Sequence, residues 1–303
     1  MSLRSFRPTI IIPTKDRAQI LAQLLGSIEQ LEAIERILPE IIVADNDSRD
    51  NTYEHVKATA RCFPTTIRAL KVRRAGKSAA VNDAVHSAKG NVLAFLDDDV
   101  VVDKTWLTSI EEFFQNGKYQ VGQGIVRLQS PAKEDPEIQK LVQRYRTIPK
   151  LEHDPKLKEV HSLNGSNFFV SRDVFDRVGG FDERLGPGAS GTSEDVEFAH
   201  RLGRSGICIG YAPKAVVYHH VDRGRLTDEY FKQSHWRQGR SRLLIRNRSA
   251  AAILFNLVHA FAQYALYTLL CKERNRYRSK GRIYHYLGMI EAKQNNAGHP
   301  EDR

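Results

Sequence analysis

Short apolar runs recur along the first 100 residues of the chain, and most of them end in a cluster of polar residues. The runs predict strands over 9–12, 40–44, 67–72 and 91–96. Between the strands, apolar residues at three- and four-residue spacing predict helices, of which 78–88 is one. Because strands that alternate with helices form a parallel sheet covered by helices, the pattern predicts an α/β fold.

The pattern weakens after residue 128 and then returns. Later elements are predicted as a strand at 167–170, helices at 172–178 and 192–202, and a last strand at 216–218. The intervening segment 129–160 is polar, charged and rich in proline, with one helical stretch over 137–145. We therefore expect 129–160 to be an excursion from the sheet that covers the site or faces the acceptor.

The tail contains a long stretch, Ser249 to Cys271, that has no Asp, Glu, Lys or Arg and is flanked by arginine-rich segments. Its polar residues Asn256, His259 and Gln263 recur at helical spacing and mark one stripe. Together these features favour a helix that lies on an anionic membrane surface. A membrane span and a core or dimer helix of a soluble protein remain as alternatives.

Composition supports an ordinary globular chain. The 303 residues include 46 Lys and Arg against 36 Asp and Glu, and this net charge of +10 predicts attraction to an anionic partner. The three cysteines are widely spaced, which indicates neither a disulfide framework nor a cysteine zinc site. The apolar run at 9–12 is too short for a signal peptide, so we expect a cytoplasmic protein at the inner face of the cell membrane.

Three consecutive carboxylates, Asp97, Asp98 and Asp99, follow the strand at 91–96. In an open α/β sheet, the carboxyl ends of the strands form the edge where ligands bind. Three adjacent acids repel one another unless a cation joins them, and oxygen ligands favour Mg²⁺ or Mn²⁺. The alternative is an acidic turn on a solvated surface.

Two glycine motifs do not indicate nucleotide binding of the usual kinds. The stretch Gly186 to Gly191 matches G-x-G-x-x-G, but no hydrophobic strand precedes it. Gly76-Lys77-Ser78 resembles the end of a P-loop, yet Lys71 stands where the first glycine is required. Gly76 and Lys77 are nevertheless placed at a helix start, where a phosphate could bind.

The chain contains an ordered series of motifs. They are Ile11-Ile12-Pro13-Thr14-Lys15-Asp16-Arg17, Val43-Ala44-Asp45-Asn46-Asp47-Ser48, Gly76-Lys77-Ser78-Ala79-Ala80-Val81-Asn82, Phe95-Leu96-Asp97-Asp98-Asp99, Val178-Gly179-Gly180-Phe181-Asp182-Glu183 and Ser193-Glu194-Asp195-Val196-Glu197-Phe198-Ala199-His200-Arg201-Leu202. This series resembles family 2 glycosyltransferases, which have the GT-A fold, and the resemblance covers about residues 8–220.

The resemblance implies a GT-A catalytic domain over 1–225, with a Rossmann-like, mostly parallel sheet flanked by helices. Residues 1–100 would form the nucleotide-binding half and 101–225 the acceptor half. Residues 226–303 lie outside the resemblance, and their own basic and apolar stretches predict a helical extension that associates with the membrane.

The resemblance also assigns residues to the nucleotide-sugar donor. Asp45 would contact the base or ribose, with Pro13 and Thr14 in the same pocket. The diphosphate and ribose would be contacted by Arg74, Lys77, Asp97 and Asp98. Family members usually have two acids and a glycine where this chain has Asp45-Asn46-Asp47, which leaves the base open, with UDP favoured.

For catalysis, the resemblance implies an inverting transfer in which Asp195 is the general base and Glu194 lies beside it. Acids at the start of a helix are also common for structural reasons, because they complement the helix dipole. The metal would be bound by Asp97 and Asp99. His219 would be a third ligand, or else a buried histidine satisfied by the backbone.

The expected activity is transfer of a sugar from a nucleotide-diphosphate sugar to a saccharide or lipid-linked acceptor, in cell-surface polysaccharide or glycolipid synthesis. A nucleotidyltransferase is an alternative, although 13–17 lack the glycine that its signature needs. A non-catalytic basic adaptor for membranes or nucleic acid is another, but it would not need the acids at 97–99 and 194–195. We expect no nucleic acid partner, and a dimer through the C-terminal helix remains open.

Overall fold

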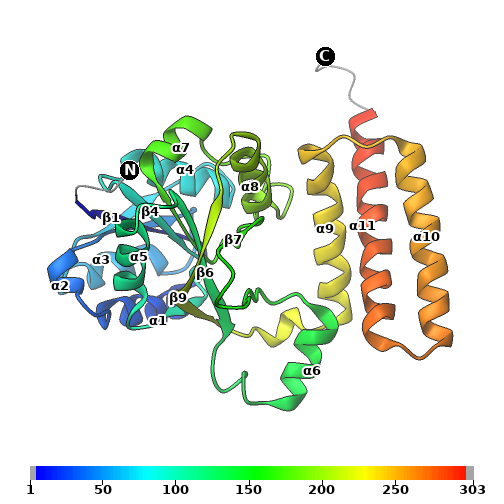
Figure 1. Ribbon diagram of the computed structural model, residues 1–303, viewed down its shortest axis with the longest axis horizontal. Coiled ribbons are helices and arrows are strands. Elements are labelled where there is room, and N and C mark those ends of the chain that lie inside the picture. The colour runs from blue at the N-terminus through cyan, green and yellow to red at the C-terminus, as the bar shows by residue number, and fades with distance from the viewer. Residues whose placement is uncertain (1–4, 298–303) are drawn as a thin grey trace. The chain divides into compact units, whose positions relative to one another are not determined.

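The computed structural model describes residues 5–297 and divides the chain into two compact units (Figure 1). Unit 1 contains the residues up to Gln129 together with Pro149–Glu183 and Glu194–His220. Unit 2 contains Ser130–Ile148, Arg184–Ser193 and the residues from Val221 onward. The catalytic domain and the tail were expected to meet at residue 225, and unit 2 includes two earlier segments as well as the tail.

Unit 1 is built on one mixed sheet. Its strands are β1 (Pro8–Thr14), β2 (Glu40–Asp45), β3 (Ile67–Lys71), β4 (Val92–Leu96), β5 (Val100–Val102), β6 (Val121–Leu128), β7 (Glu159–Val160), β8 (Asn167–Ser171) and β9 (Ile209–His219). They lie in the order β3-β2-β1-β4-β8-β6-β9-β5, and β7 pairs with β9. The strands β3, β2, β1 and β4 are parallel, as the alternating pattern predicted.

After β4 the sheet becomes mixed, because β8 runs antiparallel to both β4 and β6, and β5 runs antiparallel to β9. The strand β9 is also longer than the predicted 216–218. Its register with β6 shifts between Gly124 and Ile125, so that 213–215 form a bulge. Pro213 and Lys214 in this bulge interrupt the apolar pattern, which explains why only the end of the strand was predicted.

Helices cover both faces of the sheet. In unit 1 they are α1 (Ala18–Glu29), α2 (Ile34–Ile37), α3 (Thr52–Thr59), α4 (Lys77–Ser87), α5 (Trp106–Gln115), α7 (Arg172–Val178) and α8 (Glu194–Arg204). Alternate residues of β1 point to opposite faces, so Ile10 and Ile12 belong to one core cluster and Ile11 to another. A strand buried on both faces has a continuous apolar run, as β1 has.

Unit 2 is helical. It comprises α6 (Pro136–Tyr145), the short 3₁₀ helix η1 (Arg223–Arg225), α9 (Asp228–Ile245), α10 (Ala250–Leu269) and α11 (Glu273–Ala297). The helix α11 lies between α9 and α10 (Figure 1). Gly239 of α9 faces the backbone of His285, and Gly288 of α11 faces the backbone of Trp236, so these two helices meet where a side chain would not fit. The expected C-terminal helical extension is thus present.

Candidate active site

The parallel strands bring the expected site residues to one edge of the sheet. Thr14 ends β1, Asp45 ends β2, and the three acids Asp97 to Asp99 follow β4 directly. Since β1 pairs with both β2 and β4, the carboxyl ends of these three strands are neighbours. This is the edge at which open α/β sheets bind ligands.

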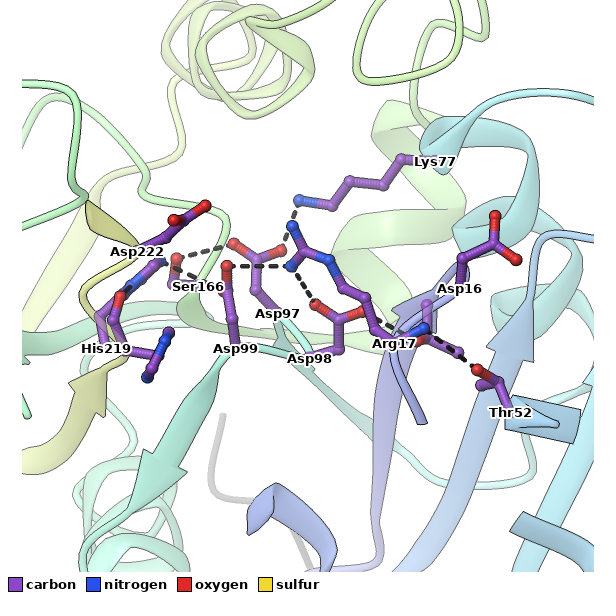
Figure 2. Close-up of polar contacts among 12 residues, drawn as sticks. Asp16, Arg17, Thr52, Lys77, Asp97, Asp98, Asp99, Ser166, His219 and Asp222 are labelled. Carbon is purple, nitrogen blue, oxygen red and sulfur yellow. Dashed lines mark hydrogen bonds and ion pairs between the residues drawn. The ribbon is translucent and has the colours of Figure 1, made fainter. Parts of the chain in front are cut away.

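Lys77, the first residue of α4, connects two of the predicted acids. Its Nζ lies 2.5 Å from Oδ1 of Asp97 and 3.2 Å from Oε1 of Glu194. The hydroxyl of Ser166 donates to the other oxygen of Asp97 at 2.7 Å (Figure 2). Gly76 precedes the helix with φ of 112°, a left-handed conformation that glycine adopts without strain and that starts α4 at this point.

These contacts determine the charge states of Lys77 and Asp97. Burial disfavours the carboxylate of Asp97, but the Lys77 ammonium and the Ser166 hydroxyl outweigh burial and lower its pKa to about 2. Burial also opposes the charge on Lys77, yet Asp97 and Glu194 raise the lysine pKa above its ordinary value. Both groups are therefore charged at neutral pH.

Asp98 binds two residues at the end of β1 and just after it. It accepts a hydrogen bond from Thr14 Oγ1 at 2.8 Å. It also pairs with Arg17 Nη1 at 2.8 Å (Figure 2). The same Arg17 nitrogen lies 3.0 Å from Oδ2 of Asp99. Burial raises the pKa of Asp98 to about 6, although Arg17 acts in the opposite direction. Thr14 and Asp98, expected at the donor, thus bind each other and tie β1 to β4.

Asp99 faces His219 at the end of β9. His219 is 1% exposed, and its Nδ1 lies 2.6 Å from the carbonyl oxygen of His220, which can only accept. Nδ1 therefore carries the proton. The buried Nε2, which has no hydrogen-bond partner in the described part of the chain, lies 3.2 Å from Oδ1 of Asp99. A carboxylate oxygen and an imidazole lone pair that face each other form a donor set for a divalent cation.

The fit to a metal is partial. Within residues 5–297, no group of three or more His, Cys, Asp or Glu side chains is arranged to bind a metal ion. Asp99 and His219 fit as a pair of ligands, whereas Lys77 and Ser166 engage the oxygens of Asp97, the other expected ligand. A metal here would take its remaining ligands from the donor diphosphate or from water.

Asp195 lies in the first turn of α8. Its Oδ2 accepts a hydrogen bond from the Gly165 N–H at 3.0 Å, and its Oδ1 accepts one from the Val196 N–H at 2.8 Å. Burial and the neighbouring Glu194 raise the pKa of Asp195 to about 7, against the lowering effect of Lys77 and of the two N–H donors. A carboxylate with this pKa can accept a proton at neutral pH.

A cavity with about 320 Å³ of empty space opens beside this carboxylate. Its lining comprises Pro13, Lys77, Ser78, Val81, Phe95, Leu96, Gly165, Phe168, Phe181, Glu194 and Asp195. Pro13, Lys77, Glu194 and Asp195 were predicted as site residues, and the structure brings all four to this cavity. The cavity combines an apolar wall with a few convergent charged groups, as small-molecule sites usually do.

At the end of β2, Asp45 is 1% exposed and its Oδ1 accepts a hydrogen bond from the Ser48 N–H at 3.3 Å. Its Oδ2 is buried and makes no hydrogen bond within residues 5–297. The adjacent Asn46 donates to the carbonyl oxygens of Val72 and Arg74 and accepts from the Gly76 N–H. Asn46 therefore holds the loop before α4, and Asp45 keeps one oxygen for a ligand.

Arg74, predicted at the diphosphate, lies on the surface. Its guanidinium forms ion pairs with Asp83 and Glu183, both partly exposed. Arg74 is therefore held by two acids of unit 1, its predicted contact with the diphosphate stays a prediction, and Lys77 lines the cavity.

The contacts of two site residues carry no local sequence signal, although Arg17 ends the first motif. Arg17 and Ser166 contact the acids from 69 to 81 residues away in the chain. The buried side-chain amides of Gln123 on β6 and Asn167 on β8 connect these two strands. Gln123 donates to the backbone carbonyl of Asn167 at 2.8 Å and accepts from the Asn164 N–H at 2.7 Å. These two amides hold the loop that carries Gly165 and Ser166.

The curled sheet flanked by helices, with its polar edge and the acid on α8, has the architecture of GT-A glycosyltransferases. Residues 9–179 match the sequence model of Glycosyl transferase family 2. The match covers more than half of the chain, and the chain belongs to this family of glycosyltransferases.

Relatives and solved structures agree with this family. The chain is 27% identical over 292 residues to the succinoglycan biosynthesis protein ExoM of Rhizobium meliloti (strain 1021). The alignment covers 91% of this chain and 92% of the relative. Its fold resembles that of the mannosyltransferase PcManGT from Pyrobaculum calidifontis, solved in complex with GDP-Man and Mn²⁺. The TM-score is 0.65 and the sequence identity 16%, and the match covers 96% of this chain and 88% of the mannosyltransferase chain. S. aureus TarS 1-349 in complex with UDP-GlcNAc has a TM-score of 0.57 and 16% identity, over 95% and 92% of the two chains.

Proposed function

We propose that this glycosyltransferase moves a sugar from a UDP-sugar to a hydroxyl of a saccharide acceptor, with inversion at the anomeric carbon. The carrying observation is Asp195, a carboxylate with a pKa of about 7 that lines the cavity next to Lys77. A single displacement needs one base on the acceptor oxygen and no protein nucleophile on the sugar. Asp195 fits this role because the Gly165 and Val196 N–H groups fix its orientation.

Glu194 and Lys77 support the base rather than replace it. Glu194 is 8% exposed and its carboxylate lies 3.2 Å from Lys77 Nζ, so it is already paired. Burial and charge repulsion from Glu194 raise the pKa of Asp195, so Asp195 is the carboxylate that can take a proton near neutral pH. When Asp195 takes the acceptor proton, the repulsion between the two carboxylates is relieved.

Asp45 supports the choice of UDP. Its buried Oδ2 is a hydrogen-bond acceptor in need of a donor. Uracil offers the N3–H of its ring, and a hydrogen bond from that group to a carboxylate is stronger than one between neutral groups. The two solved neighbours are complexes with GDP-Man and with UDP-GlcNAc. Since guanine also has a ring N–H, Asp45 supports a base with such a donor, and the donor panel below distinguishes UDP from GDP.

Asp99 and His219 would bind Mg²⁺ or Mn²⁺. The ion would neutralise the negative charge that develops on the departing nucleoside diphosphate. Arg17 lies 3.0 Å from the other oxygen of Asp99, so it fixes the carboxylate with one oxygen turned toward His219. Lys77 supplies a second positive charge at the cavity wall.

The acceptor follows from the relatives. The similar protein of Rhizobium meliloti is named for succinoglycan biosynthesis, and another relative, 24% identical over 243 residues, is named for O-antigen biosynthesis. We infer that this chain likewise extends a cell-surface polysaccharide or glycolipid.

The test is a donor panel of UDP-, GDP- and dTDP-sugars, assayed for binding and hydrolysis with and without Mn²⁺. We expect one UDP-sugar to bind with metal, and Asp195→Asn to bind it equally well but to turn over 10²–10⁴-fold more slowly, which is roughly the contribution of a general base. Asp173→Asn, which changes an exposed acid of α7, is the matched control. Retention at the anomeric carbon of the product, detected by NMR, would contradict the single displacement.

A further inference from the structure

We propose that α10 is an interfacial anchor that seats one exposed apolar face in an anionic lipid bilayer. The proposal concerns unit 2 alone and does not depend on the transferase chemistry. It commits to a lipid surface as the occupant of this face.

The helix α10 is apolar on two sides. One side packs on α11, where Leu257 and Ala260 join Ile283 in a small core cluster. A second side, the outer face, is exposed and consists of Leu254, Phe255, Val258, Phe261, Leu266 and Leu269. Phe255 is 74% exposed, Val258 61% and Leu269 83%. An exposed apolar face of this extent, on a helix that is already packed on another side, marks an interaction surface.

The small buried fraction of α10 differs from that of a core helix in a soluble protein. Among the described residues, it is the helix long and apolar enough to cross a membrane, and only 17% of its most apolar 18-residue window is buried. A core helix of the same composition would be mostly buried. Something outside the described chain therefore covers the outer face.

Charge identifies the covering partner. Between Arg246 and Lys280 the chain has seven basic residues and one acid, Glu273, and that acid pairs with Arg144 at 2.5 Å. The helix itself has no charged residue, so positive charge gathers at both of its ends. Anionic lipid headgroups complement this arrangement, and each basic side chain near such a surface strengthens binding by roughly fivefold.

The same charges argue against a second copy of the chain. In a parallel pair of α10 helices, Arg248 would meet Arg248. In an antiparallel pair, Arg248 would meet Lys272. Either arrangement places like charges together at both ends of the contact, which opposes association.

A hydrogen bond argues against a span. Gln263, inside α10, accepts a hydrogen bond from the Arg282 guanidinium of α11 at 3.0 Å. If α10 crossed the bilayer, it would carry this guanidinium into the hydrocarbon, where an unpaired charge is costly. Asn256, His259 and Gln263 instead form a polar stripe that a helix lying in the interface can turn to the headgroups and to α11.

The test uses the full chain and measures flotation with vesicles of phosphatidylcholine alone or mixed with phosphatidylglycerol at a ratio of about 3:1. We expect binding to the anionic vesicles at roughly 0.1 M salt and much weaker binding at higher salt, because surface charges are then screened. Phe255→Ser with Val258→Ser should lower the vesicle affinity at least about tenfold, since two apolar side chains no longer enter the lipid.

Two matched controls make the result specific. Leu38→Ser removes a 59% exposed apolar side chain of unit 1 and should leave binding unchanged. Arg246→Gln with Arg248→Gln should lower the affinity for anionic vesicles by roughly fivefold per charge, whereas Arg61→Gln with Arg204→Gln should not. Leu269→Ser gives a second probe of the outer face, and thermal unfolding verifies that each variant folds.

Four results would overturn the proposal. The first is that the intact chain does not bind anionic vesicles, and the second is that the Phe255→Ser, Val258→Ser variant binds them as well as the intact chain does. The third is that the intact chain is a dimer whereas this variant is a monomer. The fourth is that the intact chain stays in the bilayer through an alkaline wash. The third would assign the outer face to a second copy and the fourth would assign α10 to a span.

Discussion

Lys77 Nζ lies 2.5 Å from Oδ1 of Asp97 and 3.2 Å from Oε1 of Glu194, so a single ammonium joins the strand end of β4 to the start of α8. The lysine side chain is only 20% exposed, and solvent screens the ion pairs little. One residue of α4 thus holds together the donor side and the base side of the cavity.

Lys77→Met is expected to lower the free energy of unfolding at neutral pH by about 2–3 kcal/mol, because two buried carboxylates lose their shared cation. Since Lys77 lowers the folded-state pKa of Asp97 from 3.8 to about 2, its contribution is present above pH 3.8 and is lost as the pH falls toward 2. Denaturant unfolding at neutral and acid pH measures both effects. Lys71→Met, which alters a 45% exposed lysine, should cost less than about 0.5 kcal/mol.

The rate of transfer should depend on pH through Asp195. Because its pKa is raised to about 7, we expect kcat/KM to increase with pH below this value and to level off above it. A profile that stays flat between about pH 5 and pH 8 would show that another group limits the reaction.

The same raised pKa has a consequence for stability. Asp195 binds its proton more tightly in the folded chain than in the unfolded chain, so it stabilises the fold fully below pH 3.8 and loses this effect as the pH rises through about 7. Asp195→Asn, which is slow in turnover, should therefore be more stable than the parent chain at alkaline pH. Equal or lower stability at alkaline pH would contradict the burial of this charge.

Asp45 should govern the affinity for the nucleotide. Asp45→Asn exchanges a carboxylate oxygen for an amide, and loss of the charge-assisted hydrogen bond should weaken UDP binding by roughly 10- to 100-fold. Asp47→Asn, two residues further along at an exposed position, should change it little. Isothermal titration with UDP and Mn²⁺ compares the two, and equal losses would move the base contact away from Asp45.

The buried amide of Asn167 should matter for stability more than any single charge of the site. It accepts from Trp106 Nε1 and donates to the carbonyl oxygens of Ile125 and Ala215, all at 2.9 Å. Asn167→Leu leaves these buried groups without partners, and we expect a loss of about 3 kcal/mol or more in denaturant unfolding. Asn116→Leu, at an exposed position, serves as the control.

The strands and the acids that follow them could be predicted because their signal is local. An apolar run that stops at Asp97 indicates by itself where a strand ends, and the helical spacing of 78–88 matches α4 within one residue. The antiparallel placement of β8 beside β4 could not be predicted in this way, because it depends on pairing between strands more than 70 residues apart.

The difference between local sequence signals and long-range contacts also explains which site residues were predicted and which were not. Asp97, Asp195 and Lys77 belong to motifs whose neighbours reveal them. Arg17 ends the first motif, but nothing near it in the sequence indicates its pairing with Asp98, and Ser166 belongs to none of the motifs. Both contacts form only when the sheet brings these residues to Asp98 and Asp97. Arg74 pairs with Asp83 and Glu183 in the structure, and its contact with the diphosphate stays a prediction.

Unit 2 is assembled from stretches that leave the ribosome at very different times. Tyr145 at the end of α6 packs against Phe231 and Tyr277, with ring centroids 5.9 Å and 5.6 Å apart. At a synthesis rate of about 5–20 residues per second, Tyr277 emerges roughly 10 s after Tyr145. The apolar side of α6 therefore stays uncovered until α11 has been synthesised. A chain stopped after His220 would leave α6 without its packing partners, so the tail is not a module that can be cut away or exchanged on its own.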